Sequence, residues 1–300
     1  MATILDVELP NHFLVLCAGL VQRRLALASV AVLAYLSTPV RAREIDPPNR
    51  VLPEVTAPLA RAHAHNDYEH RRPLFDALAR GFASVEADVW LSGGQLLVAH
   101  HYFQTSTNRT LASLYLEPLR KRVAARGGSV YRGSQRSFQL LIDVKWDGEN
   151  TYRAIHAELA RYPELFTRYE GNAVYKGPVT AIISGKCPHE LLRKQRVRYA
   201  GCDGSLDDLR RPADPALTPL ISERWGALFD WEGQGAMPSA ERAKLRALAM
   251  QTRGRRQQLR FWGTPDQPAV WNELLSAGVD YIGSDALDRL RRFLSVNDRL

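Results

Sequence analysis

The sequence predicts an α/β fold, a (β/α)8 TIM barrel with a short β-hairpin after its second strand. Two observations lead to this prediction. Short apolar runs alternate with helix-like segments along the chain, which is typical of βαβ units and a parallel sheet. The chain has 300 residues, of which 45% are hydrophobic. This is enough for a single barrel of about 250 residues with a large core.

The first 42 residues have the pattern of a targeting segment. Arg23 and Arg24 precede an apolar run over 25–36, and small residues lead up to Ala42. The pattern predicts a signal peptide cleaved after Ala42, with secretion or export to the periplasm. The apolar run is shorter than the about twenty residues that a spanning helix needs. An uncleaved N-terminal membrane anchor is the alternative.

Residues 43–60 contain prolines and polar residues and are predicted to be a linker, followed by one domain over 61–300. Nine strand-like runs follow one another in this part of the chain, at 61–65, 84–90, 96–100, 138–144, 179–184, 197–202, 218–222, 259–263 and 279–283. Helix-like segments lie between most of them, at 73–80, 111–125, 151–162, 188–195, 239–253 and 269–277.

One of the nine runs must lie outside an eight-stranded barrel. Ser92-Gly93-Gly94 leaves only a tight turn before the run at 96–100, whereas a parallel pair needs a crossover of about a dozen residues. The run at 96–100 is therefore predicted to return as an antiparallel hairpin strand. The seventh strand boundary, around 218–231, is the weakest. The alternative there is a lid formed by the neighbouring glycines and three aromatic residues, Trp225, Phe229 and Trp231.

Acidic residues gather at the ends of the predicted strands. Glu86 and Asp88 lie two apart in one strand and therefore point to the same face, and Asp143 lies near the end of another. Ionised carboxylates in apolar strands are costly to bury without a cation. Hard oxygen ligands suit magnesium and calcium, so these three acids predict one divalent cation, Mg²⁺ or Ca²⁺. Lys145 follows on the same face as Asp143, where it is expected to contact an anionic substrate.

Two histidines at strand ends are the candidates for acid–base catalysis. His65 and His100 both lie near the acids, and imidazole exchanges protons near neutral pH. His63 and His101 each adjoin one of them and are expected to face the other way.

The chain is basic, with a formal net charge of +8. Its arginines are dispersed, which favours a basic, soluble surface; attraction to an anionic substrate or a peripheral contact with an anionic membrane is the functional alternative. No basic tract is interleaved with aromatic residues, so nucleic acid is not an expected partner. Cys187 and Cys202 either form a disulfide or stand as two unpaired core residues.

The segments His65-Asn66-Asp67-Tyr68 and Val85-Glu86-Ala87-Asp88-Val89-Trp90 resemble the superfamily of phosphatidylinositol-phospholipase-C-like and glycerophosphodiester phosphodiesterases. Within it, the pattern is most similar to the branch of altered inheritance of mitochondria protein 6. Weaker matches extend to Phe261-Trp262-Gly263-Thr264-Pro265 and Gly278-Val279-Asp280-Tyr281-Ile282.

The resemblance implies a metal-dependent phosphodiester hydrolase acting on a small phosphodiester or phospholipid-derived substrate. One divalent cation would be held by Glu86, Asp88 and Asp143. His65 and His100 would lie on opposite sides of the scissile phosphodiester. The nucleophile would be a neighbouring hydroxyl of the substrate, giving a cyclic phosphate, or water. The resemblance also assigns a phosphate contact to Lys145 and a pocket wall to Trp262.

Three positions depart from the pattern of these relatives. Asn66 lies in the substrate-binding region where glycerophosphodiesterases have arginine, which weakens the case for a glycerophosphodiester substrate. His101 replaces an aspartate that often follows the second histidine, and Asp143 is shorter than the glutamate of many relatives.

Two other functions are compatible with parts of the sequence. His63-Ala64-His65 resembles the metal-binding pair of amidohydrolase-like barrels, but those need further histidines after later strands, and His156 and His189 lie in or next to predicted helices. The second alternative is an exported barrel that binds phospholipid without turnover.

Overall fold

The computed structural model describes residue 55 and residues 57–171 and 173–298, which belong to one compact unit over Val51–Leu300. The predicted signal peptide or anchor and most of the predicted linker lie outside the described residues. Within the described ranges, no helix has the length and apolar character needed to cross a membrane.

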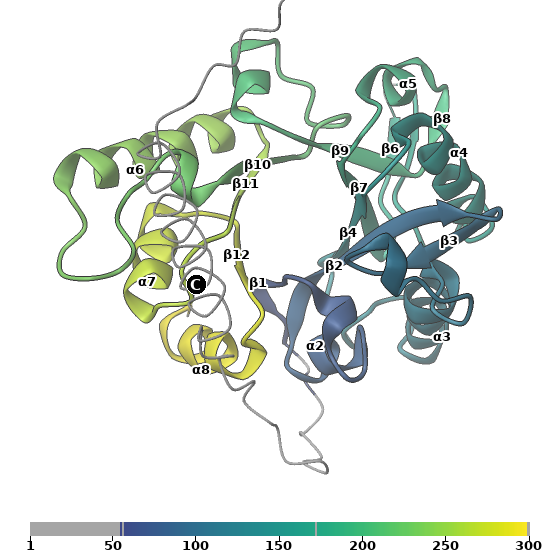
Figure 1. Cartoon of the computed structure of the whole chain (residues 1–300), viewed down its shortest axis with the longest axis horizontal. Coiled ribbons are helices and arrows are strands. Elements are labelled where there is room, and N and C mark those ends of the chain that lie inside the picture. Colours follow the sequence, from purple (N-terminus) through teal and green to yellow (C-terminus); the bar gives the residue numbers. More distant parts are fainter. Residues whose placement is uncertain (1–54, 56, 172, 299–300) are drawn as a thin grey trace, which may run out of the picture. The chain divides into compact units, whose positions relative to one another are not determined.

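Eight parallel strands close into a barrel, which confirms the predicted fold class (Figure 1). The sheet closes because the first strand pairs with both the second and the last. In order around the barrel, the strands are β1 (Leu59–Ala64), β2 (Phe82–Ser92), β4 (Phe138–Val144), β7 (Val179–Gly185), β9 (Ala200–Gly204), β10 (Leu220–Arg224), β11 (Gln258–Trp262) and β12 (Tyr281–Ser284).

Helices surround the ring of strands (Figure 1). A π-helical segment, Ala112–Leu116, leads into α3, and the helix after the last strand, α8, was not among those predicted. The helices are α2 (Phe75–Ala79), α3 (Glu117–Ala125), α4 (Gly148–Leu159), α5 (His189–Lys194), α6 (Ser239–Gly254), α7 (Pro268–Ala277) and α8 (Leu287–Asn297).

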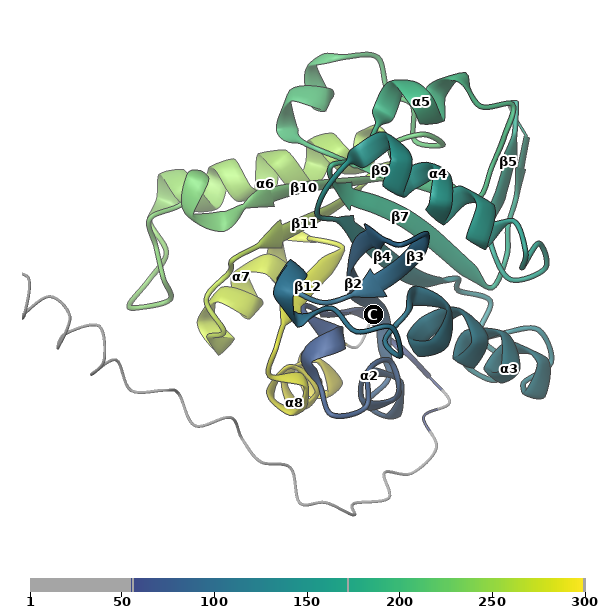
Figure 2. The same ribbon diagram turned by 45° about the vertical axis from the view of Figure 1, so that its right-hand side comes forward.

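Four short strands lie outside the barrel wall. β3 (Gln95–Val98) pairs antiparallel with the end of β2, with Val89 opposite Val98. β5 (Arg168–Glu170), β6 (Ala173–Tyr175) and β8 (Val197–Arg198) form a separate antiparallel sheet on the side of α4 and α5 (Figure 2). The predicted run at 197–202 is therefore divided between this small sheet and β9.

The interior of the barrel changes from apolar to polar towards the carboxyl ends of the strands. Leu141, Ile182, Leu220 and Tyr281 form a buried cluster. Two residues further along three of these strands, on the same face, stand Asp143, Ser184 and Ser222. The apolar layer thus closes the barrel beneath a polar site at the end where barrel enzymes place their active sites.

The alternative of a lid after 218–222 is wrong. This run forms β10, and Trp225, Phe229 and Trp231 are all buried. The rings of Trp225 and Phe229 lie 4.3 Å apart, and the Trp225 indole donates a hydrogen bond to the Trp231 carbonyl oxygen. These aromatic residues form part of the core behind the barrel wall.

Candidate active site

The deeper layer of the site joins Arg260 of β11 to residues of β1 and β2. The Arg260 Nη1 lies 2.8 Å from His63 Nε2 and 3.2 Å from Glu86 Oε2. His63 Nε2 also lies 3.3 Å from Glu86 Oε2, but the shorter contact is with the guanidinium, which only donates. Nε2 therefore accepts from Arg260, and Nδ1–H donates to Ser84 Oγ at 2.7 Å. His63 is therefore neutral. Burial, helped by the charge of Arg260, lowers the pKa of His63 to about 4.

Glu86 carries its charge in this layer although it is almost fully buried. Burial acts to raise the pKa of its carboxyl, but the guanidinium of Arg260 more than offsets this and holds the pKa well below its usual range. The expectation that His63 faces away from the acids is wrong, because residues two apart in β1 share one face and His65 points the same way. Sequence reasoning missed Arg260. Its position two residues before Trp262 in the same strand could have placed it on the same face as that predicted site residue.

The upper layer is organised around Lys145. Its Nζ lies 2.6 Å from Asp88 Oδ2 and 2.8 Å from Asp143 Oδ2, and Asp88 and Asp143 are direct neighbours across β2 and β4. Burial acts to lower the pKa of Lys145, but the two carboxylates more than offset it and raise the pKa. Burial and the nearby Glu86 charge raise the pKa of Asp88 to about 6, against the opposing effect of Lys145.

A glycine sets the position of the Asp143 carboxylate. Ser184 Oγ donates to Asp143 Oδ1 at 2.8 Å. The next residue, Gly185, has a φ of 65°, and a Cβ there would lie 2.8 Å from that oxygen and 2.6 Å from the Val144 carbonyl oxygen. Only glycine allows β7 to end so close to this acid.

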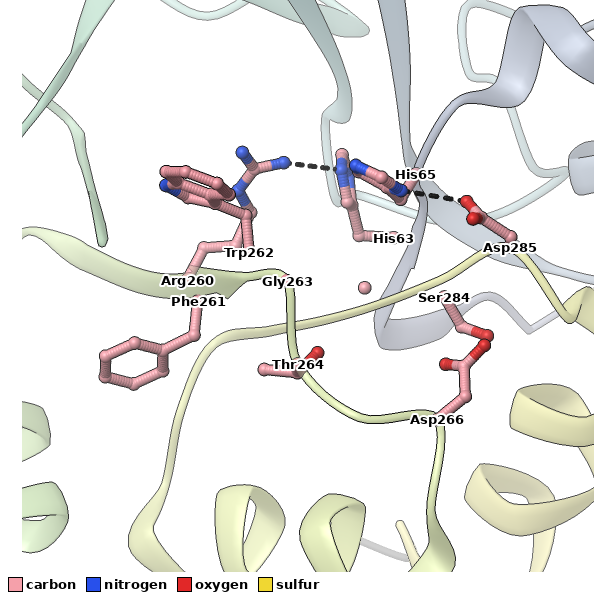
Figure 3. A pocket seen from close by; sticks show the side chains of 11 residues that line it. His63, His65, Arg260, Phe261, Trp262, Gly263, Thr264, Asp266, Ser284 and Asp285 are labelled. Atoms are coloured by element: carbon pink, nitrogen blue, oxygen red, sulfur yellow. Dashed lines mark hydrogen bonds and ion pairs between the residues drawn. The ribbon is translucent and has the colours of Figure 1, made fainter. Parts of the chain in front are cut away.

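Each predicted catalytic histidine contacts a carboxylate through its Nδ1. His65 Nδ1 lies 2.8 Å from Asp285 Oδ1, just after β12, and His100 Nδ1 lies 3.1 Å from Asp88 Oδ2 (Figure 3 shows the first pair). Burial acts to lower the pKa of His65, but Asp285 and the Glu86 charge raise it overall. Sequence reasoning missed Asp285, whose position directly after the last strand was the available signal.

Asn66 and Tyr68 lie between the two histidines. The Asn66 amide nitrogen is 3.0 Å from His65 Nδ1, and its amide oxygen is 2.7 Å from the Tyr68 hydroxyl. That hydroxyl is also 2.6 Å from Asp88 Oδ2 and 3.0 Å from His100 Nδ1. Both polar ends of the Asn66 side chain are thus engaged within the site.

A small cavity opens beside His65. Its volume is about 140 Å³, and its walls include His63, His65, Arg260, Trp262, Thr264 and Asp285 (Figure 3). Trp262, predicted as a pocket wall, is half-exposed, and the Arg224 guanidinium lies 5.8 Å from its ring centre. The cavity is smaller than the roughly 300–1,000 Å³ typical of ligand pockets, so it has room for a small polar group.

The acids do not form a compact cluster around one point. Among the described residues, only Cys187, His189 and Cys202 place three ligand atoms within 4.8 Å of one another, and the two cysteines are joined in a disulfide. Glu86 instead pairs with Arg260, and Asp88 and Asp143 both contact Lys145. His156 and His189 lie on α4 and α5, so the described residues give the amidohydrolase alternative no support.

Comparisons with known proteins show similarity to phosphodiesterases. A model of the AIM6-like phosphodiesterase domain matches residues 53–201, and one of the glycerophosphoryl diester phosphodiesterase family matches residues 258–288. Altered inheritance of mitochondria protein 6 of Eremothecium gossypii is 29% identical over 84% of this chain and 75% of its own length. Its homolog in Arthroderma benhamiae is 27% identical over 89% of this chain and 98% of its own.

A glycerophosphodiester phosphodiesterase from Parabacteroides distasonis aligns with a TM-score of 0.49 and 14% identity, over 81% of this chain and all of that one.

Proposed function

The chain belongs to the family of AIM6-like phosphodiesterases, and we propose that it hydrolyses phosphodiesters with a divalent cation and two-histidine acid–base catalysis. One observation supports this mechanism above all. His65 and His100 each contact a carboxylate through Nδ1, at 2.8 Å and 3.1 Å. Each Nε2 is then the ring atom left to exchange a proton with substrate.

The proton transfers balance between the two imidazoles. One neutral imidazole removes the proton of the attacking hydroxyl as its oxygen bonds to phosphorus. The other, charged imidazole gives its proton to the leaving alcohol oxygen as that P–O bond breaks. The attacking hydroxyl belongs to the substrate in a cyclising reaction, or to water in direct hydrolysis.

The acidic residues fit a hard divalent cation, Mg²⁺ or Ca²⁺. Asp88 Oδ1 is buried and has no hydrogen-bond partner among the described residues, so it is the oxygen free to bind such an ion. Asp88 would hold the ion together with Asp143 and Glu86, whose carboxylates here contact Lys145 and Arg260. When bound, the cation supplies Lewis-acid neutralisation of the phosphate charge.

The cationic groups of the site favour an anionic substrate. Arg260 and Lys145 each carry a positive charge among the carboxylates. A divalent cation would add two positive charges beside them, which favours binding of a phosphodiester monoanion. We assign the phosphate contact to Lys145 and a wall of the alcohol site to Trp262. The predicted substrate contact of Asn66 stays a prediction.

A phospholipid-derived substrate at a membrane surface is consistent with the rim of the site. Exposed aromatic and basic side chains follow several barrel strands and the hairpin, and tryptophan, tyrosine and basic residues favour the interface of a bilayer. Phe103, the most exposed of the aromatic residues, stacks on the ring of His101 at 5.2 Å. The rim consists of Tyr102, Phe103, Trp146, Lys186, Arg224 and Trp262.

We also propose that the chain is exported, with cleavage after Ala42. The Cys187–Cys202 disulfide supports an oxidising compartment. Mass spectrometry of the protein from its natural source should find a chain starting at Arg43. A chain that retains the first 42 residues would contradict cleavage and favour the anchor.

Phosphorus NMR of a panel of phosphodiesters, with and without chelator, tests the proposed activity. The panel should include glycerol, inositol, choline and ceramide derivatives, because the spectrum reports both the bond cleaved and any cyclic product. We expect turnover that chelator abolishes and that His65→Ala or His100→Ala lowers by about 10² or more. His156→Ala, on the helix α4, is the matched control. Binding without turnover across the panel would indicate a non-catalytic barrel instead.

A further inference from the structure

The contacts around Asn66 and Tyr68 determine which atoms donate and which accept. Tyr68 has one hydroxyl proton, yet its oxygen lies within 3.0 Å of three polar atoms, on Asn66, Asp88 and His100. The shortest contact, 2.6 Å, is to Oδ2 of Asp88, which also accepts from Lys145. A charged acceptor makes the stronger bond, so Tyr68 donates to Asp88.

The Asn66 amide must then donate to Tyr68. Its oxygen is placed 2.7 Å from the Tyr68 oxygen, where two acceptors would face each other. The oxygen and nitrogen of an amide occupy equivalent positions, and their assignment follows from the hydrogen-bond network. Exchanging them lets Asn66 Nδ2 donate to Tyr68 and turns Oδ1 towards His65 Nδ1, 3.0 Å away.

The exchanged orientation of the Asn66 amide is consistent with the contact between His65 and Asp285. Asp285 is 2.8 Å from His65 Nδ1 and can only accept, so that nitrogen carries a proton. The Nδ1–H is then shared between Asp285 and the amide oxygen of Asn66. His100 Nδ1 likewise faces the acceptor Asp88 at 3.1 Å and carries a proton. Every contact of 3.1 Å or less between the two imidazoles thereby joins a donor to an acceptor, and the exchange gives up only the 3.5 Å contact of the Asn66 amide nitrogen with Asp285 Oδ1.

We propose that Asn66 and Tyr68 are positioning residues that link His65 to His100 through one hydrogen-bond path and hold both rings as Nδ1–H tautomers. Both Nε2 atoms then face the substrate. The backbone supports this role, because Asn66 has a φ of 49° and a ψ of 37°, a left-handed conformation in which asparagine is strongly enriched. The inference rests on the proposed catalytic use of the two histidines.

Nitrogen NMR of the wild-type enzyme labelled with ¹⁵N-histidine tests the tautomers without any substrate. At alkaline pH, where the imidazoles are neutral, His65 and His100 should both show a protonated Nδ1 and an unprotonated Nε2. Alanine variants of each histidine assign the signals. An Nε2–H tautomer at either ring would overturn the proposal. Because this readout does not involve turnover, it distinguishes failure of the hydrogen-bond path from failure of the proposed activity.

Three variants test the path itself. Tyr68→Phe removes the hydroxyl, Asn66→Gly removes the amide while keeping the left-handed backbone accessible, and the double variant removes both. Each single change should lower kcat by about tenfold or more and change KM by less than about threefold, because misplaced catalytic groups affect the chemical step. The double variant should lie within about threefold of the worse single variant, since residues in one network are not additive.

Tyr152→Phe is the matched control, because this hydroxyl donates to Gln195 away from the site. Its kcat should equal that of the wild type. Losses that multiply in the double variant would mean two independent structural roles and would overturn the path. An unchanged kcat in Tyr68→Phe would do the same. Circular dichroism melting curves identify any variant that fails to fold, in which case the tautomers of the wild type decide the question.

Discussion

Replacing Arg260 by methionine should destabilise the protein strongly, because it leaves the Glu86 carboxylate buried without its counter-charge. Both side chains are less than a tenth exposed, and their closest atoms are 3.2 Å apart. Removing one partner of a buried pair costs about 3–5 kcal/mol. For a domain of this size, about 2–4 °C per kcal/mol corresponds to a fall in Tm of roughly 6–20 °C.

Urea unfolding at pH 7 with chelator measures this cost without a contribution from metal binding. Arg242→Met is the matched control, because Arg242 pairs with Glu273 at 2.7 Å but is one-third exposed. That change should cost much less than Arg260→Met, because an ion pair in contact with solvent contributes little to stability. Adding Glu86→Gln to Arg260→Met should recover most of the loss, since the amide carries no charge.

The pH dependence of the free energy of unfolding independently checks whether Arg260 stabilises the charged form of Glu86. In the wild type, the depressed pKa of Glu86 contributes stability above its unfolded value of 4.5, which is lost as pH falls through the folded pKa. In Arg260→Met, burial raises that pKa, so the penalty is full at neutral pH and fades as pH falls. The two stabilities should therefore converge as the pH falls from neutral towards the unfolded pKa of 4.5. An Arg260→Met protein as stable as Arg242→Met at pH 7 would refute the reasoning.

Three further outcomes follow from the site and its rim. The buried His63 has a pKa of about 4 in the folded protein and 6.5 in the unfolded chain. Between pH 6.5 and pH 4 the free energy of unfolding of the wild type should therefore fall by about 3 kcal/mol relative to that of His63→Gln. Urea unfolding that gives the same pH dependence for both proteins would contradict this. Asp285→Asn should lower the pKa of His65, which Asp285 contacts. The limb of the rate–pH profile that reports His65 should then move to lower pH, whether the ring acts as acid or as base. A limb that does not move would mean that His65 does not determine the profile. Sedimentation with anionic vesicles should show about tenfold weaker binding for the double variant Phe103→Ala/Trp146→Ala than for the wild type. Met250→Ala, at an exposed residue of α6, should bind like the wild type. Equal binding of the wild type and both variants would argue against docking through the rim.

The predicted strands agree with the barrel because their signals are local. Apolar runs bounded by turns located all eight wall strands, and the two-residue period placed Glu86 and Asp88 on one face. The small sheet was missed because β5 and β6 have three residues each and Ala173–Tyr175 is exposed. His63 was assigned to the wrong face although the same period, applied to β1, places it with His65.

The partners of the charged residues could not be read from local pattern. Arg260 lies 174 residues from Glu86, and Asp285 lies 220 residues from His65. The first pair meets across the barrel interior and the second where β12 closes against β1. The amino-acid sequence alone determined which side chains face the interior at the carboxyl ends of the strands, because side-chain direction alternates along each strand. Closure of the barrel decided which basic side chain pairs with each acid and which carboxylate contacts each histidine, because those contacts join strands that are distant in the chain.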